Sequence, residues 1–283
     1  MAATAVDSAT FDDFGFHRDR RWMLVDSTGK FLTQRTHHRM AVMTPTLTNE
    51  GLSITAPSMP PLRVSIPDGG AEQMKVSVWG DEVDATRSSV EADQWCSDFL
   101  GLACHLVYMA DDTFRPVKPR HAPNGERVHF GDRFPLLVIG EGSLADLNHK
   151  LTSAGKPPVP MDRFRPNIVI GSREPFAEDR WTAIRIGDGA SATEIRMVKP
   201  CGRCVMTTVD QRAGVSRGPE PLLTLSTYRR QWRNVMFGQN AIHHTIGTTI
   251  RLGDAVTVLG YKRPGSTETT ANADGEVTTN DRA

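Results

Sequence analysis

The apolar segments of this chain are short, and their length limits the folds that the chain can adopt. None approaches the ~18 residues that a membrane-spanning helix needs, and one of the most apolar, residues 134–139, has the length of a β-strand. Glycine, proline, asparagine and aspartate separate these segments and indicate turns between them. Many short strands with few helices are typical of barrels rather than of a doubly wound parallel sheet. The sequence therefore predicts a mainly β fold, of the α+β class, with flanking helices.

The overall charge argues against several classes of partner. The chain has 283 residues with 33 Lys and Arg against 33 Asp and Glu, so its formal net charge is zero. This balance argues against a protein that coats nucleic acid or an anionic membrane, although a local basic pocket for a small anion is compatible with it. The N-terminal residues do not have the pattern of a signal peptide, and four cysteines are too few for a disulfide scaffold. We expect a cytoplasmic protein with reduced thiols, no membrane span and no nucleic-acid partner.

Two strand-rich regions follow one another along the chain, separated by a polar loop over residues 110–130. In the first region, Ser88 and Glu91 have the spacing of a capping box, and Gly101 is a helix stop signal. With the apolar face between them, these signals predict a helix over 89–100. The other predicted elements are helices at 143–152 and 222–232 and strands at 22–25, 31–33, 40–43, 52–56, 75–79, 102–108, 136–139, 168–170, 183–186, 194–198, 205–209, 248–251 and 255–259.

The sharpest local motif is Cys201-Gly-Arg-Cys204, which we place in a loop between two strands. Two cysteines at this spacing can bind zinc, exchange a disulfide or offer a thiolate to a softer metal, or they can be two small buried residues. Lys199 and Arg203 favour the thiolate form. Zinc needs four ligands, and no second close pair is available, so structural zinc is the weakest of these interpretations. The remaining candidate ligands are Cys96, Cys104, His37, His38, His243 and His244.

Arginines gather in predicted loops beside these strands. Arg18, Arg20 and Arg21 precede the first hairpin, and Arg163 and Arg165 lie in a loop before a later strand. Guanidinium groups suit bidentate recognition of phosphate, although solvation at the surface is the usual role of any one of them. Several together, at strand ends near a thiolate, favour an anionic ligand. The sequence has no phosphate loop of Walker type, no nucleophile elbow and no zinc-protease motif.

Taken in order, these segments resemble the MOSC-domain family, in particular the branch that contains the mitochondrial amidoxime-reducing component and its bacterial relatives. The resemblance covers roughly residues 16–260. Residues 18–26 and 31–35 resemble the N-terminal β-barrel domain that accompanies MOSC domains. The segments that resemble the MOSC domain itself are 164–170, 201–204 with 207–210, 220–222 and 237–240.

The resemblance implies two β-barrel-like domains with flanking helices. We expect the N-terminal barrel domain over residues 11–115 and the MOSC domain over 116–262. Residues 1–10 and 263–283 are small and polar, and we expect both ends to be disordered.

The resemblance also implies an enzyme, a molybdenum-dependent oxidoreductase that reduces small N-hydroxylated or N-oxygenated compounds. Its cofactor is molybdenum bound to the dithiolene of a phosphate-bearing pterin, and by motif position Cys204 is the metal ligand and catalytic residue. A thiolate is a soft ligand suited to such a metal, and arginines suit the pterin phosphate. The implied cofactor-contacting residues are Arg20, Asp132, Arg165, Asn167, Arg203, Gln239 and Asn240.

The source of electrons is expected to be a separate donor protein of ferredoxin or cytochrome b5 type, because the chain carries no ferredoxin segment. The alternative is a non-catalytic protein that binds or carries the cofactor.

One departure from the family pattern concerns the first strand. Family members open with a strand ending in a Lys-Ser pair that helps hold the cofactor. Nothing before Phe11 resembles it, and the first lysine is Lys30. We therefore expect an exposed barrel edge and weakened cofactor binding.

Overall fold

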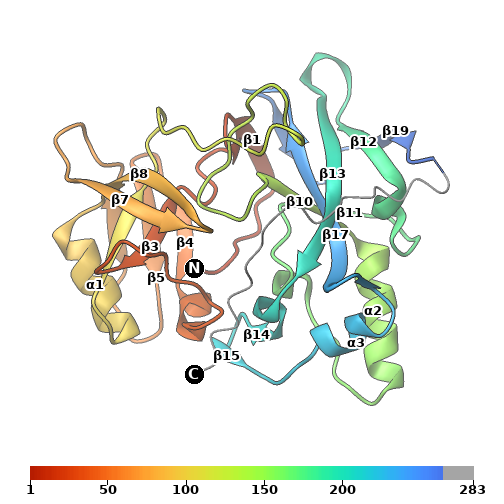
Figure 1. Ribbon diagram of the computed structural model, residues 1–283, viewed down its shortest axis with the longest axis horizontal. Coiled ribbons are helices and arrows are strands. Elements are labelled where there is room, and N and C mark those ends of the chain that lie inside the picture. The colour runs from red at the N-terminus through yellow and green to blue at the C-terminus, as the bar shows by residue number, and fades with distance from the viewer. Residues whose placement is uncertain (264–283) are drawn as a thin grey trace.

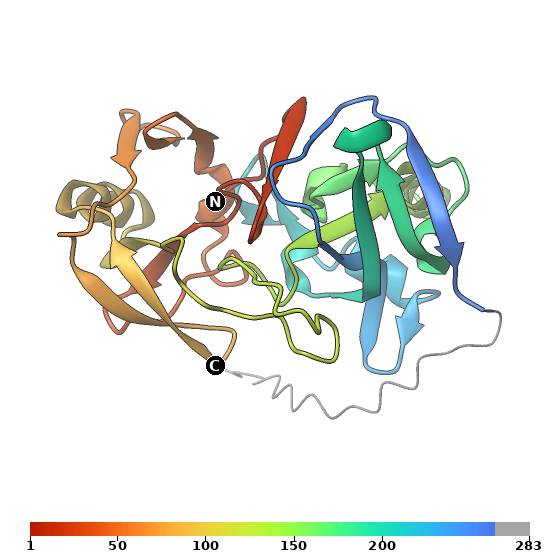
Figure 2. The same ribbon diagram turned by 90° about the horizontal axis from the view of Figure 1, so that it is seen from above.

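The computed structural model describes residues 1–263, and these form two strand-rich halves side by side (Figures 1 and 2). The fold is mainly β with short helices, which confirms the predicted fold class. The tail predicted to be disordered lies outside the described residues, apart from Arg263. No helix within the described part of the chain has the length and apolar character needed to span a bilayer.

The first half consists of two antiparallel sheets and one helix. One sheet has the strand order β3-β9-β8-β7 and the other β4-β5-β6. The helix α1 contacts β9 and β6, and apolar side chains of the helix and both sheets form one core. The bounds are β3 (Trp22–Asp26), β4 (Thr44–Leu47), β5 (Gly51–Thr55), β6 (Leu62–Ser65), β7 (Gln73–Val78), β8 (Asp81–Arg87), α1 (Val90–Leu100) and β9 (Cys104–Tyr108).

The helix α1 begins one residue later than the capping-box spacing predicts. Ser89 is its N-cap, and the Ser89 hydroxyl accepts a hydrogen bond from Ala92 N at 3.0 Å. Ser88 instead donates its backbone N–H to Leu106 O, which joins it to β9. Gly101 ends the helix in the left-handed conformation, with φ of 73°, as the sequence predicts.

The second half is built on a seven-stranded sheet of order β11-β10-β17-β13-β12-β19, with β16 paired to β17. Its helices α2 and α3 pack on one face of this sheet, and a second core fills the other face. The bounds are β10 (Leu136–Gly140), α2 (Glu141–Ser153), β11 (Ile168–Ile170), β12 (Trp181–Ile186), β13 (Thr193–Arg203), α3 (Leu222–Ser226), β16 (Arg230–Gln231), β17 (Asn234–His243) and β19 (Val256–Tyr261). The short hairpin β14 (Val209–Asp210) and β15 (Val215–Ser216) lies outside this sheet.

The N-terminal segment is not loose, so the expectation for residues 1–10 is wrong. Strand β1 (Ser8–Asp12) pairs with β18 (Thr249–Arg251) and with β2 (Gly15–Phe16), and it lies between the two halves (Figures 1 and 2). Phe11 is 1% exposed and belongs to the core of the second half. Strand β1 thus covers the edge of β18. Burial of Phe11 and pairing with a distant strand stabilise β1 and offset the weak strand propensity of this segment.

Four other predicted elements differ from the structure. Residues 31–33 were expected to be a strand, but the chain forms only an isolated bridge there, between Val25 and Phe31. Residues 40–43 and 205–209 were expected to be strands, but the chain forms 3-10 helices η1 (His38–Val42) and η5 (Val205–Thr208) there. The helix predicted over 222–232 ends at Ser226, and the chain then turns at Trp232 between β16 and β17. Short apolar runs of this kind fit a strand or a helical turn equally well, and packing decides between them. The remaining 3-10 turns are η2 (Met161–Arg163), η3 (Ala177–Arg180) and η4 (Gly189–Ser191).

Candidate functional site

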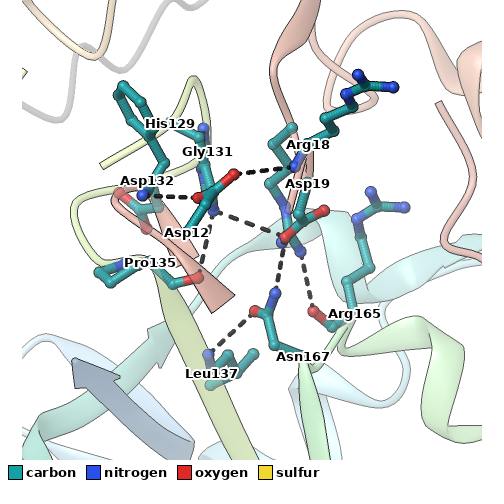
Figure 3. A network of polar contacts seen from close by, with 12 residues as sticks. Asp12, Arg18, Asp19, His129, Gly131, Asp132, Pro135, Leu137, Arg165 and Asn167 are labelled. Atoms are coloured by element: carbon teal, nitrogen blue, oxygen red, sulfur yellow. Dashed lines mark hydrogen bonds and ion pairs between the residues drawn. The ribbon is translucent and has the colours of Figure 1, made fainter. Parts of the chain in front are cut away.

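Asp19 lies at the centre of a polar network between the two halves (Figure 3). Its carboxylate accepts a hydrogen bond from Asn167 Nδ2 at 2.7 Å and another from the guanidinium of Arg20. The same oxygen lies 3.6 Å from His129 Nε2. Burial by itself raises the pKa of Asp19, but these neighbours and Arg165 together hold that pKa below its usual value. The ionised carboxylate therefore ties the β2–β3 connection to the second half.

Asn167 is fixed at the start of β11 by three hydrogen bonds. Its side-chain oxygen accepts from Leu137 N at 3.1 Å, and its backbone N–H donates to Leu137 O at 2.9 Å. Because the amide oxygen is bound to a donor, the amide nitrogen must point toward Asp19. The sequence motif that contains Asn167 thus sets the orientation of a side chain that bridges the halves.

His129 supports this network from the long loop between β9 and β10. Its ring is 1% exposed, Nδ1 accepts a hydrogen bond from Gly131 N at 2.9 Å, and Nε2 lies 3.2 Å from Pro135 O. Burial lowers the pKa of His129 to about 4, so the ring is neutral and donates from Nε2. Arg115, 4% exposed, donates to the carbonyls of His129 and Gly131 at 2.6 and 3.0 Å, which holds the loop in place.

Three arginines of the site have strained backbone conformations. Arg18, Arg20 and Arg165 have φ values of 60°, 49° and 54°, in the left-handed region that favours glycine. Such residues cost about 1–3 kcal/mol each and concentrate at functional sites. Arg20 Nη2 donates to Arg165 O at 3.3 Å, and the Arg18 and Arg165 side chains extend on the same side of the network (Figure 3).

The arginine cluster carries more positive charge than its partners neutralise. Burial lowers the pKa of Arg165 to about 10, and repulsion from Arg20 and Arg203 adds to this effect, which Asp19 opposes. The guanidinium of Arg165 donates to Gln211 Oε1 at a long 3.4 Å. Three guanidinium groups, against the two carboxylates of Asp19 and Asp162, are an arrangement that suits an anionic ligand.

The two cysteines of the motif differ in position and exposure, which corrects the predicted loop. Cys201 lies within β13 and is 7% exposed, and its Sγ accepts a hydrogen bond from Arg203 Nη1 at 3.1 Å. Burial raises the pKa of Cys201, against the influence of Arg203. Cys204 follows the end of β13 and is half-buried, and its carbonyl accepts from Thr207 N and Oγ1 at 3.2 and 3.1 Å. Cys204 is thus held by its backbone, and the residue as a whole is partly accessible.

Arg203 connects these cysteines to the arginine cluster. Its Nη2 donates to Phe164 O at 2.7 Å, immediately before Arg165 in the chain, and its Nη1 reaches Cys201. Its Nε is buried and has no hydrogen-bond partner among the described residues. A buried donor without a partner is costly, so this atom fits a site completed by a ligand with acceptor atoms.

The other three predicted site residues are placed less directly. Asp132 lies in the loop held by Arg115, and its charge raises the pKa of Cys201, so the two share one region. Asn240 Nδ2 reaches Pro200 O at 3.5 Å, beside the cysteine motif.

Gln239 is bound to residues outside the arginine cluster. Its amide donates to Asp179 at 2.6 Å and accepts from Lys262 at 3.4 Å. The structure thus brings Arg20, Arg165 and Asn167 into one network and links Arg203 to it through Phe164.

Sequence reasoning missed four residues that build the site. Asp19 stands inside the arginine-rich motif, and its place between Arg18 and Arg20 was the available signal. His129, Arg115 and Gln211 carry no local signal, because their roles depend on contacts with distant segments. His129 contacts Gly131, Arg115 contacts His129, and Gln211 contacts Arg165.

The zinc interpretation finds no support from side-chain positions. Across residues 1–263, no three or more His, Cys, Asp and Glu side chains gather as a metal site would require. His243 Nδ1 lies 3.0 Å from Thr245 O, and His244 lies 3.2 Å from Glu126, so the histidine doublet is engaged elsewhere.

Comparisons with known proteins match both halves of the chain. The model of the MOSC N-terminal beta barrel domain matches residues 1–103, and that of the MOSC domain matches residues 125–257. Mitochondrial amidoxime-reducing component 1 of Mus musculus is 33% identical over 261 residues, which cover 87% of this chain and 74% of that protein. The Homo sapiens protein of the same name is 31% identical over 86% of this chain and 73% of its own length.

Another group of relatives is much longer than this chain. Molybdenum cofactor sulfurase of Solanum lycopersicum is 30% identical over 280 residues, which cover 90% of this chain but 34% of that protein. Because two consecutive domain models match most of the chain, and the mouse relative aligns over most of its length, this protein belongs to the MOSC-domain family, with amidoxime-reducing components and cofactor sulfurases among its relatives.

Proposed function

We propose that this protein binds molybdenum cofactor between its two halves and reduces small N-hydroxylated compounds with electrons from a separate donor protein. The observation that carries the proposal is the under-neutralised arginine cluster, joined by Arg203 to the half-buried Cys204. Relatives that are amidoxime-reducing components and molybdenum cofactor sulfurases support a role involving this cofactor.

Cys204 is the proposed metal ligand, and Cys201 is not. A metal ligand must be reachable and deprotonated, and Cys204 is a partly accessible residue just beyond a strand end. Cys201 is buried within β13, where burial raises its pKa and disfavours the thiolate. The shared motif therefore has one ligand and one packing residue.

Arg165, Arg20 and Arg203 are the proposed ligands of the pterin phosphate and its neighbouring polar atoms. Arg165 has one long hydrogen bond, and Nε of Arg203 has none, so both have donors left for an anion. Asn167 already uses both amide atoms, on Leu137 and Asp19. We therefore assign it the role of a positioning residue that holds Asp19, and through it Arg20, in place.

When bound, the cofactor supplies the two-electron chemistry that breaks the N–O bond of the substrate. Two electrons and two protons convert N–OH to N–H and release the oxygen as water. The chain itself binds and orients the cofactor, and the neutral His129 and ionised Asp19 keep the surrounding loops fixed.

The test is a comparison of Cys204→Ser with Cys201→Ser, both made in a host that produces the cofactor. Molybdenum and pterin content are measured together with reduction of benzamidoxime by dithionite-reduced protein. We expect Cys204→Ser to lose turnover, because a hydroxyl is a harder ligand than a thiolate, and Cys201→Ser to retain most of it. Equal loss in both variants, or full activity in Cys204→Ser, contradicts the assignment.

The alternative function is binding or transport of the cofactor without turnover. The match to a molybdenum cofactor sulfurase favours it. This chain aligns with only about a third of that protein, so it corresponds to one part of an enzyme rather than to the whole of it. Protein that retains molybdenum and pterin but does not reduce benzamidoxime supports this alternative.

The source of electrons is tested separately. The chain has no dinucleotide fingerprint and too few cysteines for an iron–sulfur cluster beside the motif. We expect turnover with dithionite and none with NADH alone, and NADH-driven turnover by protein free of reductase contradicts this. The cytoplasmic location stays a prediction.

A further inference from the structure

The hairpin formed by β16 and β17 lies beside the end of the strand that leads to Cys204. In the sheet register, Gly202 is opposite Met236 and Arg203 is opposite Val235. A Cβ placed on Gly202 would lie 3.5 Å from Asn234 Cβ. At about 3.3 Å per residue, the hairpin tip therefore lies within a few residues' length of Cys204.

The tip of this hairpin presents a tryptophan to solvent. Trp232 is 81% exposed and has a φ of 55°, which turns the chain between the two strands. At this exposure the Trp232 side chain contributes little to the packing of its own fold. Tryptophan is enriched among the residues that dominate protein–protein binding.

Two further apolar side chains are exposed on neighbouring segments. Val205 in η5 is 52% exposed and Leu223 in α3 is 49% exposed. Helix α3 contacts both η5 and β17, and Figure 1 shows it beside the end of β17. The three apolar side chains thus lie on segments that adjoin η5 or the end of β13, the two elements on either side of Cys204.

The charge on this surface is positive. Arg230 and Arg233 flank Trp232 and are exposed, and neither guanidinium group has an ion pair or hydrogen bond among the described residues. Acidic side chains on adjoining segments are already neutralised: Asp179 is paired with Arg229, and Glu220 with Lys156. The chain is neutral overall, so this excess of positive charge is local.

We propose that Val205, Leu223, Arg230, Trp232 and Arg233 form a docking face for an acidic one-electron carrier protein. This proposal rests on the proposed function, because the face adjoins the cysteine assigned as metal ligand. A small apolar centre with a positive rim fits a transient electron-transfer contact, whose interfaces are at the small end of the range. Positive side chains would steer an acidic carrier to this face and favour the orientation that brings its redox centre toward Cys204.

The electron balance requires repeated docking. Each carrier molecule delivers one electron, so two carriers are oxidised for each N–OH group that is reduced. The two protons come from solvent, the N–O bond breaks, and the oxygen leaves as water. Because two carrier molecules must dock and leave in succession in each turnover, the interface should be weak and rapidly exchanging.

The test compares protein-driven with dithionite-driven reduction of benzamidoxime. The carriers used as probes are an acidic plant-type [2Fe–2S] ferredoxin and cytochrome b5, each kept reduced by its own reductase. The variants are Trp232→Ala and the double variant Arg230→Glu/Arg233→Glu. Arg63→Glu is the matched control, because Arg63 is an exposed arginine of β6 in the other half.

We expect the double variant to raise the KM for at least one carrier about tenfold at low ionic strength, with the difference shrinking as salt screens the charges. Trp232→Ala should raise the same KM with little dependence on salt. Turnover with dithionite should be unchanged in all variants, and Arg63→Glu should match the unaltered protein in every assay.

Two results overturn the docking face. One is an unchanged KM in both face variants. The other is failure of both carriers to drive the unaltered protein while dithionite does so. If dithionite itself drives no turnover, the proposed function fails instead, and the two failures are therefore distinguishable. Dimerisation of the unaltered protein that Trp232→Ala abolishes would assign the face to a second copy of this chain and overturn the proposal.

Discussion

Asp19 and Asn167 are 148 residues apart in the sequence and are joined by a 2.7 Å hydrogen bond. Asp19 follows β2, and Asn167 immediately precedes β11 in the large sheet. The contact therefore links the N-terminal segment to the second half at the point where Arg20 and Arg165 meet. Loss of this contact within the closed structure would leave a half-buried carboxylate with one donor fewer, which is unfavourable.

Asn167→Ala tests this link. The variant leaves Leu137 N without its side-chain acceptor and removes one donor from Asp19, so we expect the free energy of unfolding to fall by about 1–3 kcal/mol. Urea denaturation measures the change. Asn124→Ala is the control, because Asn124 is exposed, and it should change the stability little. Similar losses of stability in both variants would show that the hydrogen bonds of Asn167 contribute no more to stability than those of an exposed asparagine.

His129 predicts a loss of stability in mild acid. Burial lowers its pKa from 6.5 to about 4, so between these pH values the unfolded chain binds a proton that the folded chain does not. Stability therefore falls as the pH decreases from 6.5 to about 4, by about 3 kcal/mol from this group. We expect His129→Gln to flatten this part of the stability profile.

The control for the pH profile is His149→Gln, because His149 is exposed on α2. Its profile should follow that of the unaltered protein. If His129→Gln retains the full slope between pH 6.5 and 4, the buried neutral imidazole is not the cause of the acid sensitivity.

Arg165→Gly separates a binding role from a structural one. Glycine tolerates the φ of 54° at this position and removes repulsion within the arginine cluster. Its greater unfolded-state entropy opposes these gains, so we expect stability within about 1 kcal/mol of the unaltered protein. Molybdenum retained through gel filtration should nevertheless fall.

The contrasting variant is Arg163→Ala. Arg163 is 8% exposed and donates to Thr207 O at 3.2 Å. Its loss leaves a buried acceptor unpaired and should lower the free energy of unfolding by about 1–3 kcal/mol. A larger stability loss in Arg165→Gly than in Arg163→Ala would contradict this division of roles.

The start of α1 gives a prediction about a single cap. The Ser89 hydroxyl caps the helix, so Ser89→Ala should cost about 0.5–2 kcal/mol. Ser88 Oγ is buried without a partner among residues 1–263, so Ser88→Ala should be neutral or stabilising. Thermal melts of the two variants show which serine caps the helix. A larger loss of stability in Ser88→Ala than in Ser89→Ala would support Ser88 as the cap, as the capping-box spacing predicts.

Much of the local structure was predictable because it depends on short patterns. Alternating apolar residues predicted strands such as β7 and β13, and Gly101 marked the end of α1. The errors fall where one short apolar run fits two conformations, as at residues 40–43 and 205–209. They also fall at β1, whose partner β18 is more than two hundred residues away.

The candidate site divides in the same way. The motifs around Arg20, Arg165 and Cys204 could be selected because arginine and cysteine carry recognisable chemistry. The contributions of His129, Arg115 and Gln211 could not, because a buried histidine and a buried arginine look like surface residues in a sequence. Gln239 was selected by motif position, and the structure binds it to Asp179 and Lys262 instead of to the arginines.

The sequence by itself determined the mainly β class and, to within one residue, the helix that ends at Leu100, and it selected the residues proposed to bind an anion and a soft metal. Periodicity, turn residues and side-chain chemistry are local properties, so they can be recognised in a single amino-acid sequence. Only the tertiary structure decided that Cys201 is buried while Cys204 is partly accessible, and that Arg20, Arg165 and Arg203 share one under-neutralised cluster. These properties depend on strand register and on contacts between the two halves, which set burial and electrostatic environment and which no local pattern encodes.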